Sequence, residues 1–262
     1  MGWIFQRPGC SAFDLLGLRT FRPFRIEPLD KGQGHHGGVW SAGMSATIDA
    51  KRYSTGEEIA NGITHGLGAV LSIAGLAVLA TFASRFGDVW HIVSCSIFGT
   101  TLVLLYTAST LYHSIRFSRA KTVLRIVDHS AVFLLIAGTY TPFTLVNLRG
   151  PWGWSLFGLI WGLALLGIVF KVSLLRRWVL ASVGLYVGMG WAIVVAIKPM
   201  LAAVAPEGLV LMLLGGLAYT IGVGFYVWHR LPYHHAVWHG FVLAGSTFHF
   251  FAILFYVIPM GK

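Results

Sequence analysis

Seven long apolar stretches, separated by short polar segments, dominate the pattern of this chain. A helix needs about 20 mostly apolar residues to cross a hydrocarbon core of roughly 30 Å. Backbone polar groups in lipid must be satisfied within the segment, so each stretch is predicted to be a helix. The predicted spans cover residues 60–83, 90–112, 127–147, 152–170, 178–198, 208–228 and 236–258. The pattern therefore predicts an all-α integral membrane protein built as a bundle of seven transmembrane helices.

Composition agrees with this prediction. Of all residues 56% are hydrophobic and only 11% are charged, and the mean hydropathy is +0.74. A soluble domain carries about a quarter charged residues. Residues 1–50 differ from the rest, because they hold Gly, Pro and scattered charge without a sustained period. We expect residues 1–50 to be a mostly disordered tail and residues 51–262 to be the membrane domain.

The positive charges predict which side of the membrane each loop faces. Fifteen Lys and Arg residues lie in the N-terminal segment and in the loops after the second, fourth and sixth stretches. Four lie in the alternate loops and at the C-terminus. The positive-inside rule therefore predicts a cytoplasmic N-terminus and an outer C-terminus. The net charge of +10 is mostly explained by this topology. Its spread over several loops, without a reader motif, argues against a nucleic-acid partner.

Polar residues that are unusual in apolar helices gather at the predicted cytoplasmic end. They come from four stretches and comprise Glu58, Asn61, His65, Ser109, His113, Asp128, His235 and His239. Residues four apart, such as His235 and His239, share one helix face. Ionisable residues within a membrane span are costly, so they indicate a functional site.

The residue types in this group predict a metal centre. Three imidazoles from two helices, those of His113, His235 and His239, form an environment typical of zinc. With three protein nitrogens, the fourth coordination position stays open, as in catalytic sites. Asp128 could then hold or deprotonate a water there, or orient a ligand imidazole from behind. Ser109 lies one turn before His113 and could donate to that water or to a substrate oxygen.

Each candidate also has a plainer structural interpretation, which the sequence leaves open. The histidine pair on the seventh stretch could bond to carbonyls or lipid phosphates at the interface. Ser109 could bond within its own helix, and Glu58 could be an acid favoured by the helix dipole. Asn61 and His65 could hydrogen-bond between helices, or could support the ligand imidazoles from outside the metal's own coordination.

Two further patterns concern helix packing. Small residues four apart are suited to close helix crossings, and they occur at Gly62/Gly66, Gly158/Gly162 and Gly184/Gly188. Pro142 lies inside the third stretch, where it is predicted to kink the helix.

Five sequence elements, taken together, resemble the bacterial hemolysin III family, which is part of the progestin and adipoQ receptor superfamily. They are Glu58-Ile-Ala-Asn-Gly-Ile-Thr-His65, Ser109-Thr-Leu-Tyr-His113, Asp128-His-Ser130, Gly138-Thr-Tyr-Thr-Pro142 and His235-Ala-Val-Trp-His239. The resemblance covers about residues 53–258. It implies a seven-helix bundle with its N-terminus inside, located as a multi-pass protein in a bacterial inner (plasma) membrane. It also implies zinc held by His113, His235 and His239, with Asp128 and Ser109 around the zinc water.

The resemblance implies several activities. Its eukaryotic relatives suggest ceramidase-like hydrolysis of lipid amides, and its bacterial branch suggests haemolysis and membrane lipid homeostasis. Three hypotheses follow: a zinc-dependent hydrolase of a lipid amide or ester, a non-catalytic zinc-stabilised sensor or receptor-like regulator, and a cytolysin. A membrane lipid is the expected substrate or ligand. A homo-oligomer is left open.

Overall fold

A computed structural model describes residues 53–116, 118–173 and 179–259, and helices are the regular structure within those ranges. The α-helices are α1 (Thr55–Phe86), α2 (Val89–Ser114), α3 (Ser118–Pro142), α4 (Pro151–Ser173), α5 (Val179–Trp191), α6 (Ile197–Ala203), α7 (Pro206–Val227) and α8 (His234–Tyr256). A π-helix, η3 (Phe143–Asn147), follows α3, and a 3₁₀-helix, η5 (Ala192–Ala196), joins α5 to α6. The predicted tail at residues 1–50 lies outside the described residues.

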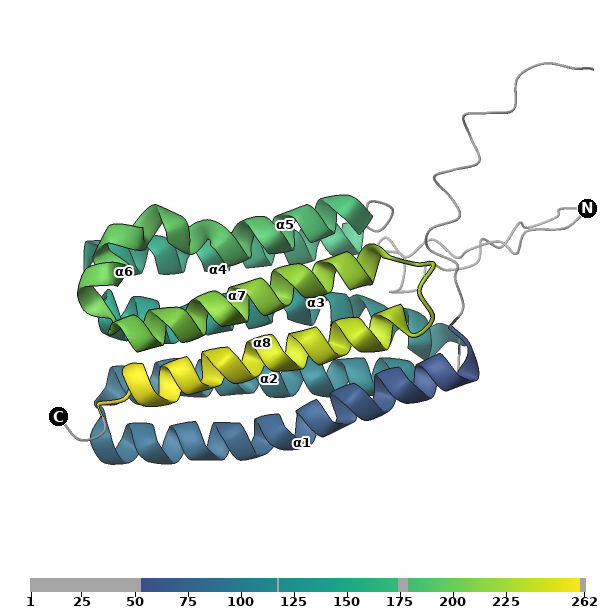
Figure 1. The fold of residues 1–262 in the computed structure, drawn as a ribbon, viewed down its shortest axis with the longest axis horizontal. Coiled ribbons are helices and arrows are strands. Elements are labelled where there is room, and N and C mark those ends of the chain that lie inside the picture. The colour runs from purple at the N-terminus through teal and green to yellow at the C-terminus, as the bar shows by residue number, and fades with distance from the viewer. Residues whose placement is uncertain (1–52, 117, 174–178, 260–262) are drawn as a thin grey trace, which may run out of the picture. The chain divides into compact units, whose positions relative to one another are not determined.

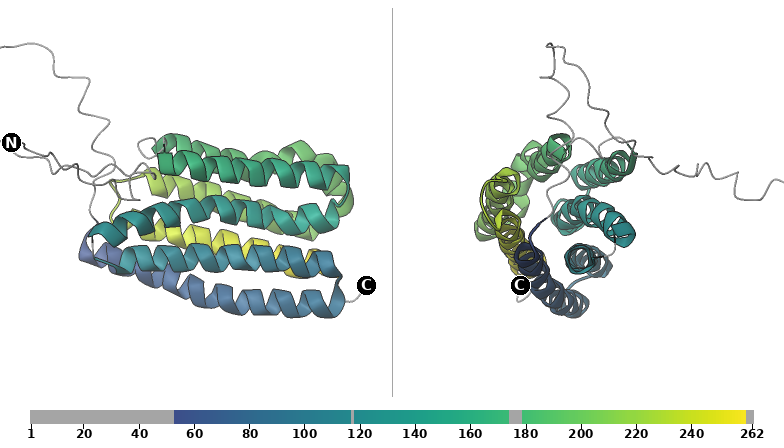
Figure 2. Two further views of the ribbon diagram at one scale, coloured as in Figure 1. Left: turned by 180° about the vertical axis from the view of Figure 1, so that it is seen from behind. Right: turned by 90° about the vertical axis from the view of Figure 1, so that its right-hand side faces the viewer.

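Seven helical segments of this part of the chain are long and apolar enough to cross a membrane, and α5, η5 and α6 together form the fifth. Each of the seven predicted stretches corresponds to one of them, so the predicted fold class is confirmed. The helices run alongside one another (Figures 1 and 2). Helix α1 packs against both α2 and α8, so the first and last spans are neighbours. This arrangement brings residues of the first span close to residues of the last span.

The polar segments at the starts of α1 and α8 are joined to each other. Ser54 caps α1: its backbone N–H donates to Glu57 Oε2 at 2.8 Å, and the Glu57 N–H donates to Ser54 Oγ at 3.2 Å. Such a capping box fixes the first turn of a helix. The other carboxylate oxygen of Glu57 accepts from the backbone N–H of Tyr233 at 3.3 Å. Tyr233, with φ 56°, is the residue from which α8 starts.

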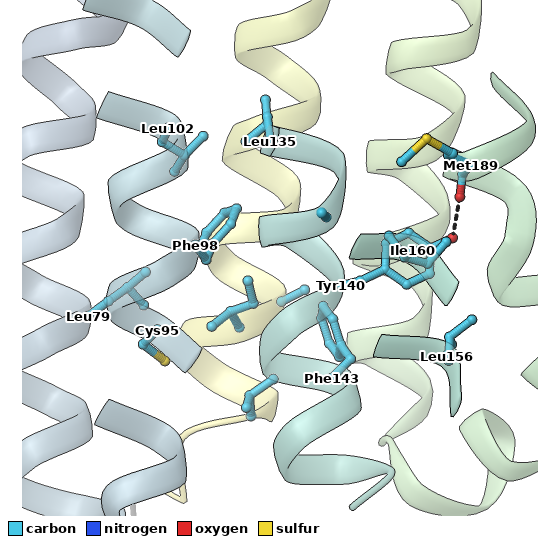
Figure 3. Close-up of a cluster of buried hydrophobic side chains, with 14 of the residues drawn as sticks. Leu79, Cys95, Phe98, Leu102, Leu135, Tyr140, Phe143, Leu156, Ile160 and Met189 are labelled. Carbon is cyan, nitrogen blue, oxygen red and sulfur yellow. Dashed lines mark hydrogen bonds between the residues drawn. The ribbon is translucent and has the colours of Figure 1, made fainter. Parts of the chain in front are cut away.

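The fifth span was predicted as one helix over residues 178–198, and the structure interrupts it with η5. The hydroxyl of Tyr140, on α3, inserts there (Figure 3). It lies 2.8 Å from the carbonyl oxygens of Met189 and Gly190 and accepts from the N–H of Ile193 at 2.9 Å. A side chain that occupies ladder positions breaks a helix. Pro199 follows in α6 and lacks the N–H that would continue the ladder.

The predicted kink in the third span lies where the backbone changes its hydrogen bonding. Helix α3 ends at Pro142 and continues directly into the π-helix η3. There the N–H of Leu148 donates to the carbonyl of Phe143, five residues earlier, at 2.9 Å. Phe143 is buried in the core with Phe98 of α2 and Ile160 of α4 (Figure 3).

Only one of the three predicted glycine pairs lies at a close helix crossing. A Cβ added at Gly62 or Gly66 would contact side chains of α2 at 3.5 and 3.7 Å. A Cβ at any member of the other two pairs would meet nothing within 4 Å among the described atoms. That prediction is wrong for Gly158/Gly162 and Gly184/Gly188, because these glycines face away from neighbouring helices.

Candidate metal centre

Three buried imidazoles meet at the predicted cytoplasmic end of the bundle. His113 lies in the last turn of α2, and His235 and His239 lie in the first turns of α8. One ring nitrogen from each residue lies within 4.8 Å of the others. The spacing along α8 puts its two histidines on one face. The packing of α2 and α8 around α1 brings the third imidazole to them.

The hydrogen bonds of these rings leave nitrogens available for a metal. The Nδ1 of His113 lies 2.6 Å from Glu58 Oε2, and its Nε2 has no partner among the described residues. The Nδ1 of His239 lies 3.3 Å from the carbonyl oxygen of Asn61. Neither ring nitrogen of His235 has a partner in the described part of the chain. Buried polar atoms without partners are costly and rare. The donor set therefore fits a zinc ion.

Glu58 fixes the ring of His113 in the orientation that a ligand needs. Its carboxylate receives the imidazole on one oxygen and the Lys121 ammonium on the other, at 2.6 Å each. Lys121 also lies 5.0 Å from the ring centre of Tyr112. A carboxylate behind a ligand imidazole sets its tautomer and raises its basicity. Lys121 is one of the positive charges in the loop after the second stretch, and nothing in the sequence pairs it with Glu58.

Asn61 and His65 of α1 also lie against the three imidazoles. The Asn61 amide nitrogen lies 3.4 Å from His113 Nδ1. The His65 ring stacks on that of His239, with ring centres 3.5 Å apart and planes 12° apart. Its nitrogens form no hydrogen bond within the described ranges. Both residues are buried, so they shape the inner side of the cluster.

Asp128 and Ser109 complete the predicted group. Asp128 extends from α3 and is 8% exposed, whereas Ser109 on α2 is fully buried and faces that carboxyl. The Ser109 hydroxyl interacts with that carboxyl, and it makes no hydrogen bond of strict geometry with any described residue. His129 donates to the carbonyl of Arg125 at 2.7 Å, and its Nδ1 lies 3.7 Å from Asp128 Oδ2. Asp128 is not part of the close three-nitrogen group, which suits a proton acceptor better than a ligand.

A cavity of about 140 Å³ leads from this cluster into the bundle. Asp128, His235 and His239 line it at one end. Its walls are mostly aliphatic and aromatic and come from α3, α5, α7 and α8, including Leu135 and Val242. The imidazoles of His235 and His239 therefore face an apolar space and are not enclosed by protein on every side.

The ring of Tyr53 lies against the histidine cluster, and no sequence pattern indicated this contact. Its ring centre lies 5.1 Å from that of His235 and 5.9 Å from that of His113. Burial raises the pKa of the Tyr53 hydroxyl. An aromatic residue just before the first span is common, so its contact with the histidines depends on the fold.

Comparison with known proteins agrees with the resemblance. The family model described as "Haemolysin-III related" matches residues 53–250. The chain is 49% identical over 204 residues to "Hemolysin-3 homolog" of Bacillus subtilis (strain 168), covering 78% of this chain and 96% of that one. It is 50% identical over 206 residues to "Hemolysin-3" of Bacillus cereus, covering 79% and 94%. It is 28% identical over 209 residues to the human "Monocyte to macrophage differentiation factor", covering 77% and 84%.

Proposed function

The chain belongs to the haemolysin-III related family of multi-pass membrane proteins, and from this premise we propose that it is a zinc-dependent hydrolase of a lipid amide or ester. The observation that carries the proposal is a cluster of three imidazoles, two of which, those of His235 and His239, line one end of an apolar cavity. A purely structural metal site is closed by protein ligands, whereas a catalytic one keeps an open position. We place the protein in the inner (plasma) membrane of a bacterium, where it acts in lipid homeostasis.

His113, His235 and His239 would hold the metal. When bound by three imidazoles, zinc polarises a carbonyl and lowers the pKa of a bound water to about 7. Glu58 keeps His113 in the tautomer that carries its proton on Nδ1, because Nδ1 donates to the carboxylate at 2.6 Å. The lone pair of Nε2 is then available to a metal. The carbonyl of Asn61 does the same for His239. These contacts orient two of the three imidazoles, those of His113 and His239, before any ligand arrives.

Asp128 is the residue that would move protons. Its carboxylate lines the cavity beside the imidazoles, within reach of a water near the substrate carbonyl. In amide hydrolysis the water oxygen bonds to the carbonyl carbon while its proton passes to Asp128. The C–N bond then breaks, and Asp128 returns the proton to the leaving nitrogen. The products are a carboxylic acid and an amine.

Ser109 would stabilise the carbonyl oxygen as it gains negative charge. Its buried hydroxyl faces the Asp128 carboxyl and has no hydrogen bond of good geometry among the described residues, so its proton can turn to that oxygen. The apolar cavity walls would hold the hydrocarbon of the substrate and exclude bulk water.

A non-catalytic sensor or receptor-like regulator is the second candidate. One observation favours it: the three imidazoles come from two different helices, α2 and α8. A metal there would join the two spans and stabilise the bundle without turnover. Cytolysis, the third hypothesis, is supported here only by the names of the two bacterial relatives.

The test compares wild type with Asp128→Asn in detergent, using metal analysis and a panel of ceramides, other N-acyl lipids and phospholipids. We expect about one zinc per chain in both proteins, and cleavage by wild type only. Loss of a general base lowers the rate by roughly 10²- to 10⁴-fold. Glu207→Gln is the matched control, because Glu207 is an exposed acid at the other end of the bundle.

Two results would contradict the proposal. Wild type without zinc would exclude both the hydrolase and the zinc-stabilised regulator. Full zinc occupancy without cleavage of any panel lipid would leave the regulator as the better account.

A further inference from the structure

The cavity is also lined by an imidazole far from the three-histidine cluster, that of His249. This residue lies ten positions after His239 on α8, which corresponds to roughly 15 Å along a helix axis. His249 is 8% exposed and lines the cavity. An imidazole at this depth in an apolar bundle is costly unless it has a partner.

The hydrogen bonding of His249 leaves one nitrogen as an unused acceptor. Its Nδ1 donates to the carbonyl of Gly245, one turn earlier, at 2.8 Å. A neutral ring that donates from Nδ1 has its lone pair on Nε2. Within the described residues Nε2 has no hydrogen bond. The ring stacks on Tyr219 with centres 5.5 Å apart.

The hydroxyls around His249 are already engaged with one another. Ser246 Oγ lies 2.8 Å from the Tyr106 hydroxyl and 2.9 Å from the Tyr219 hydroxyl. These three groups bond to one another in the core, and the cavity that His249 lines is the side from which a ligand donor would reach Nε2.

The crossing of α7 and α8 leaves room for this ring. A Cβ at Gly215 of α7 would collide with the His249 imidazole, and one at Gly245 of α8 would lie 2.7 Å from the Tyr219 ring. Only glycine allows the two backbones to accommodate both rings in this way. The position of His249 at the cavity wall is therefore held from both helices.

We infer that His249 binds a hydroxyl group carried on the hydrocarbon portion of the cavity's ligand, so that the preferred ligand is a lipid hydroxylated far from its head group. This inference rests on the proposed function, in which a lipid head group reaches the imidazole cluster and its chain lies in the cavity. In an apolar cavity, a few placed polar groups determine which ligand is preferred. An imidazole acceptor at one depth favours a ligand that carries a donor at the matching depth and does not strengthen the binding of an unsubstituted hydrocarbon chain.

The test measures competition against radiolabelled stearic acid on the full-length protein in detergent. The competitors are stearic acid, 2-hydroxystearic acid and 12-hydroxystearic acid, which carry no hydroxyl, one beside the head group and one far along the chain. We expect the 12-hydroxy acid to bind wild type about fivefold more tightly than either of the others.

Two variants assign the preference to the ring nitrogen. In His249→Phe the ring that stacks on Tyr219 is kept and the acceptor is lost, so the preference should disappear while stearic acid binding changes by less than about twofold. In His249→Gln an amide oxygen replaces the acceptor, so part of the preference should return.

Equal binding of the three acids to wild type would overturn the inference, as would binding of none. A preference that survives in His249→Phe would overturn it too. Binding is measured without turnover and repeated after zinc chelation, whereas the proposed hydrolase is decided by zinc content and cleavage. Failure of one therefore remains distinguishable from failure of the other.

Discussion

At the end of the bundle where α1 passes into α2, Asp88 and Arg149 are exposed polar residues with partners. Asp88 is 53% exposed in its side chain and caps α2 by accepting from the N–H groups of Trp90 and His91 at 2.9 and 3.2 Å. Arg149 lies 3.5 Å from the same carboxylate. At the opposite end, His113 and His235 are buried and carry ring nitrogens with no partner among the described residues.

The contrast shows how a structural polar group differs from one held for a ligand. A helix cap such as Asp88 stabilises by about 1 kcal/mol while remaining in water. A buried group without a partner costs about 1–3 kcal/mol. A fold that keeps several such groups together, beside a cavity, is expected to recover the cost when something binds. The following experiments ask whether the two ends differ in this way.

The largest effect is expected from removing a ligand imidazole. In His239→Ala or His235→Ala, zinc in the purified protein should fall below about a tenth of wild type, because two nitrogens hold the metal far less tightly than three. Inductively coupled plasma mass spectrometry on the detergent-purified protein measures this. His91→Ala removes an imidazole from the opposite end and should keep its zinc. Full occupancy in His239→Ala would show that the metal binds elsewhere.

The next effect is expected at the carboxylate behind His113. Glu58→Gln should weaken zinc affinity by roughly 10- to 100-fold, because the amide neither sets the imidazole tautomer nor pairs with Lys121 as well. Competition with a zinc chelator gives the affinity. Glu57→Gln is the neighbouring control, since Glu57 accepts from the backbone N–H of Tyr233. Equal affinities in the two variants would remove Glu58 from the site.

A smaller effect is expected at Ser109. Ser109→Ala should lower kcat about tenfold, equivalent to about 1.4 kcal/mol, with zinc content unchanged, because the hydroxyl acts on the reacting oxygen alone. Ser94→Ala is a matched control: Ser94 is equally buried on the same helix, and its hydroxyl donates to the His91 carbonyl at 3.3 Å. If the two variants lose activity equally, Ser109 has only a packing role.

The smallest effect is expected at the exposed end. Asp88→Ala should cost about 1 kcal/mol and lower Tm by about 2–4 °C at neutral pH, without loss of zinc. The His91 side chain holds the pKa of Asp88 below its usual value. The stabilisation is therefore present above the unfolded pKa and is lost as pH falls through the folded pKa. Thermal unfolding of both proteins at several pH values should show the difference narrowing in acid. A constant difference would mean that the charge of Asp88 contributes nothing.

The predicted spans and the placement of the polar group at one end agree with the structure, because hydropathy and depth depend on stretches of local sequence. Packing between helices was predicted less well. The glycines at Gly158 and Gly184 fit a close-crossing pattern and yet face outward, while Gly215 and Gly245, outside any such pair, accommodate large rings. A small-residue pattern indicates that two helices can approach closely at that point. The rotation of each helix about its axis decides whether they do.

The same distinction applies to the site. By itself, the sequence determined seven apolar helices, their predicted orientation, and three histidines and an aspartate at one membrane depth. Only the tertiary structure decided that Glu58 holds His113 from 55 residues away, that Tyr140 interrupts the fifth span, and that His249 faces the same cavity as the cluster. Depth follows from the position of a residue within its own helix. Partners depend on how helices distant in the sequence rotate and pack, which no local pattern records.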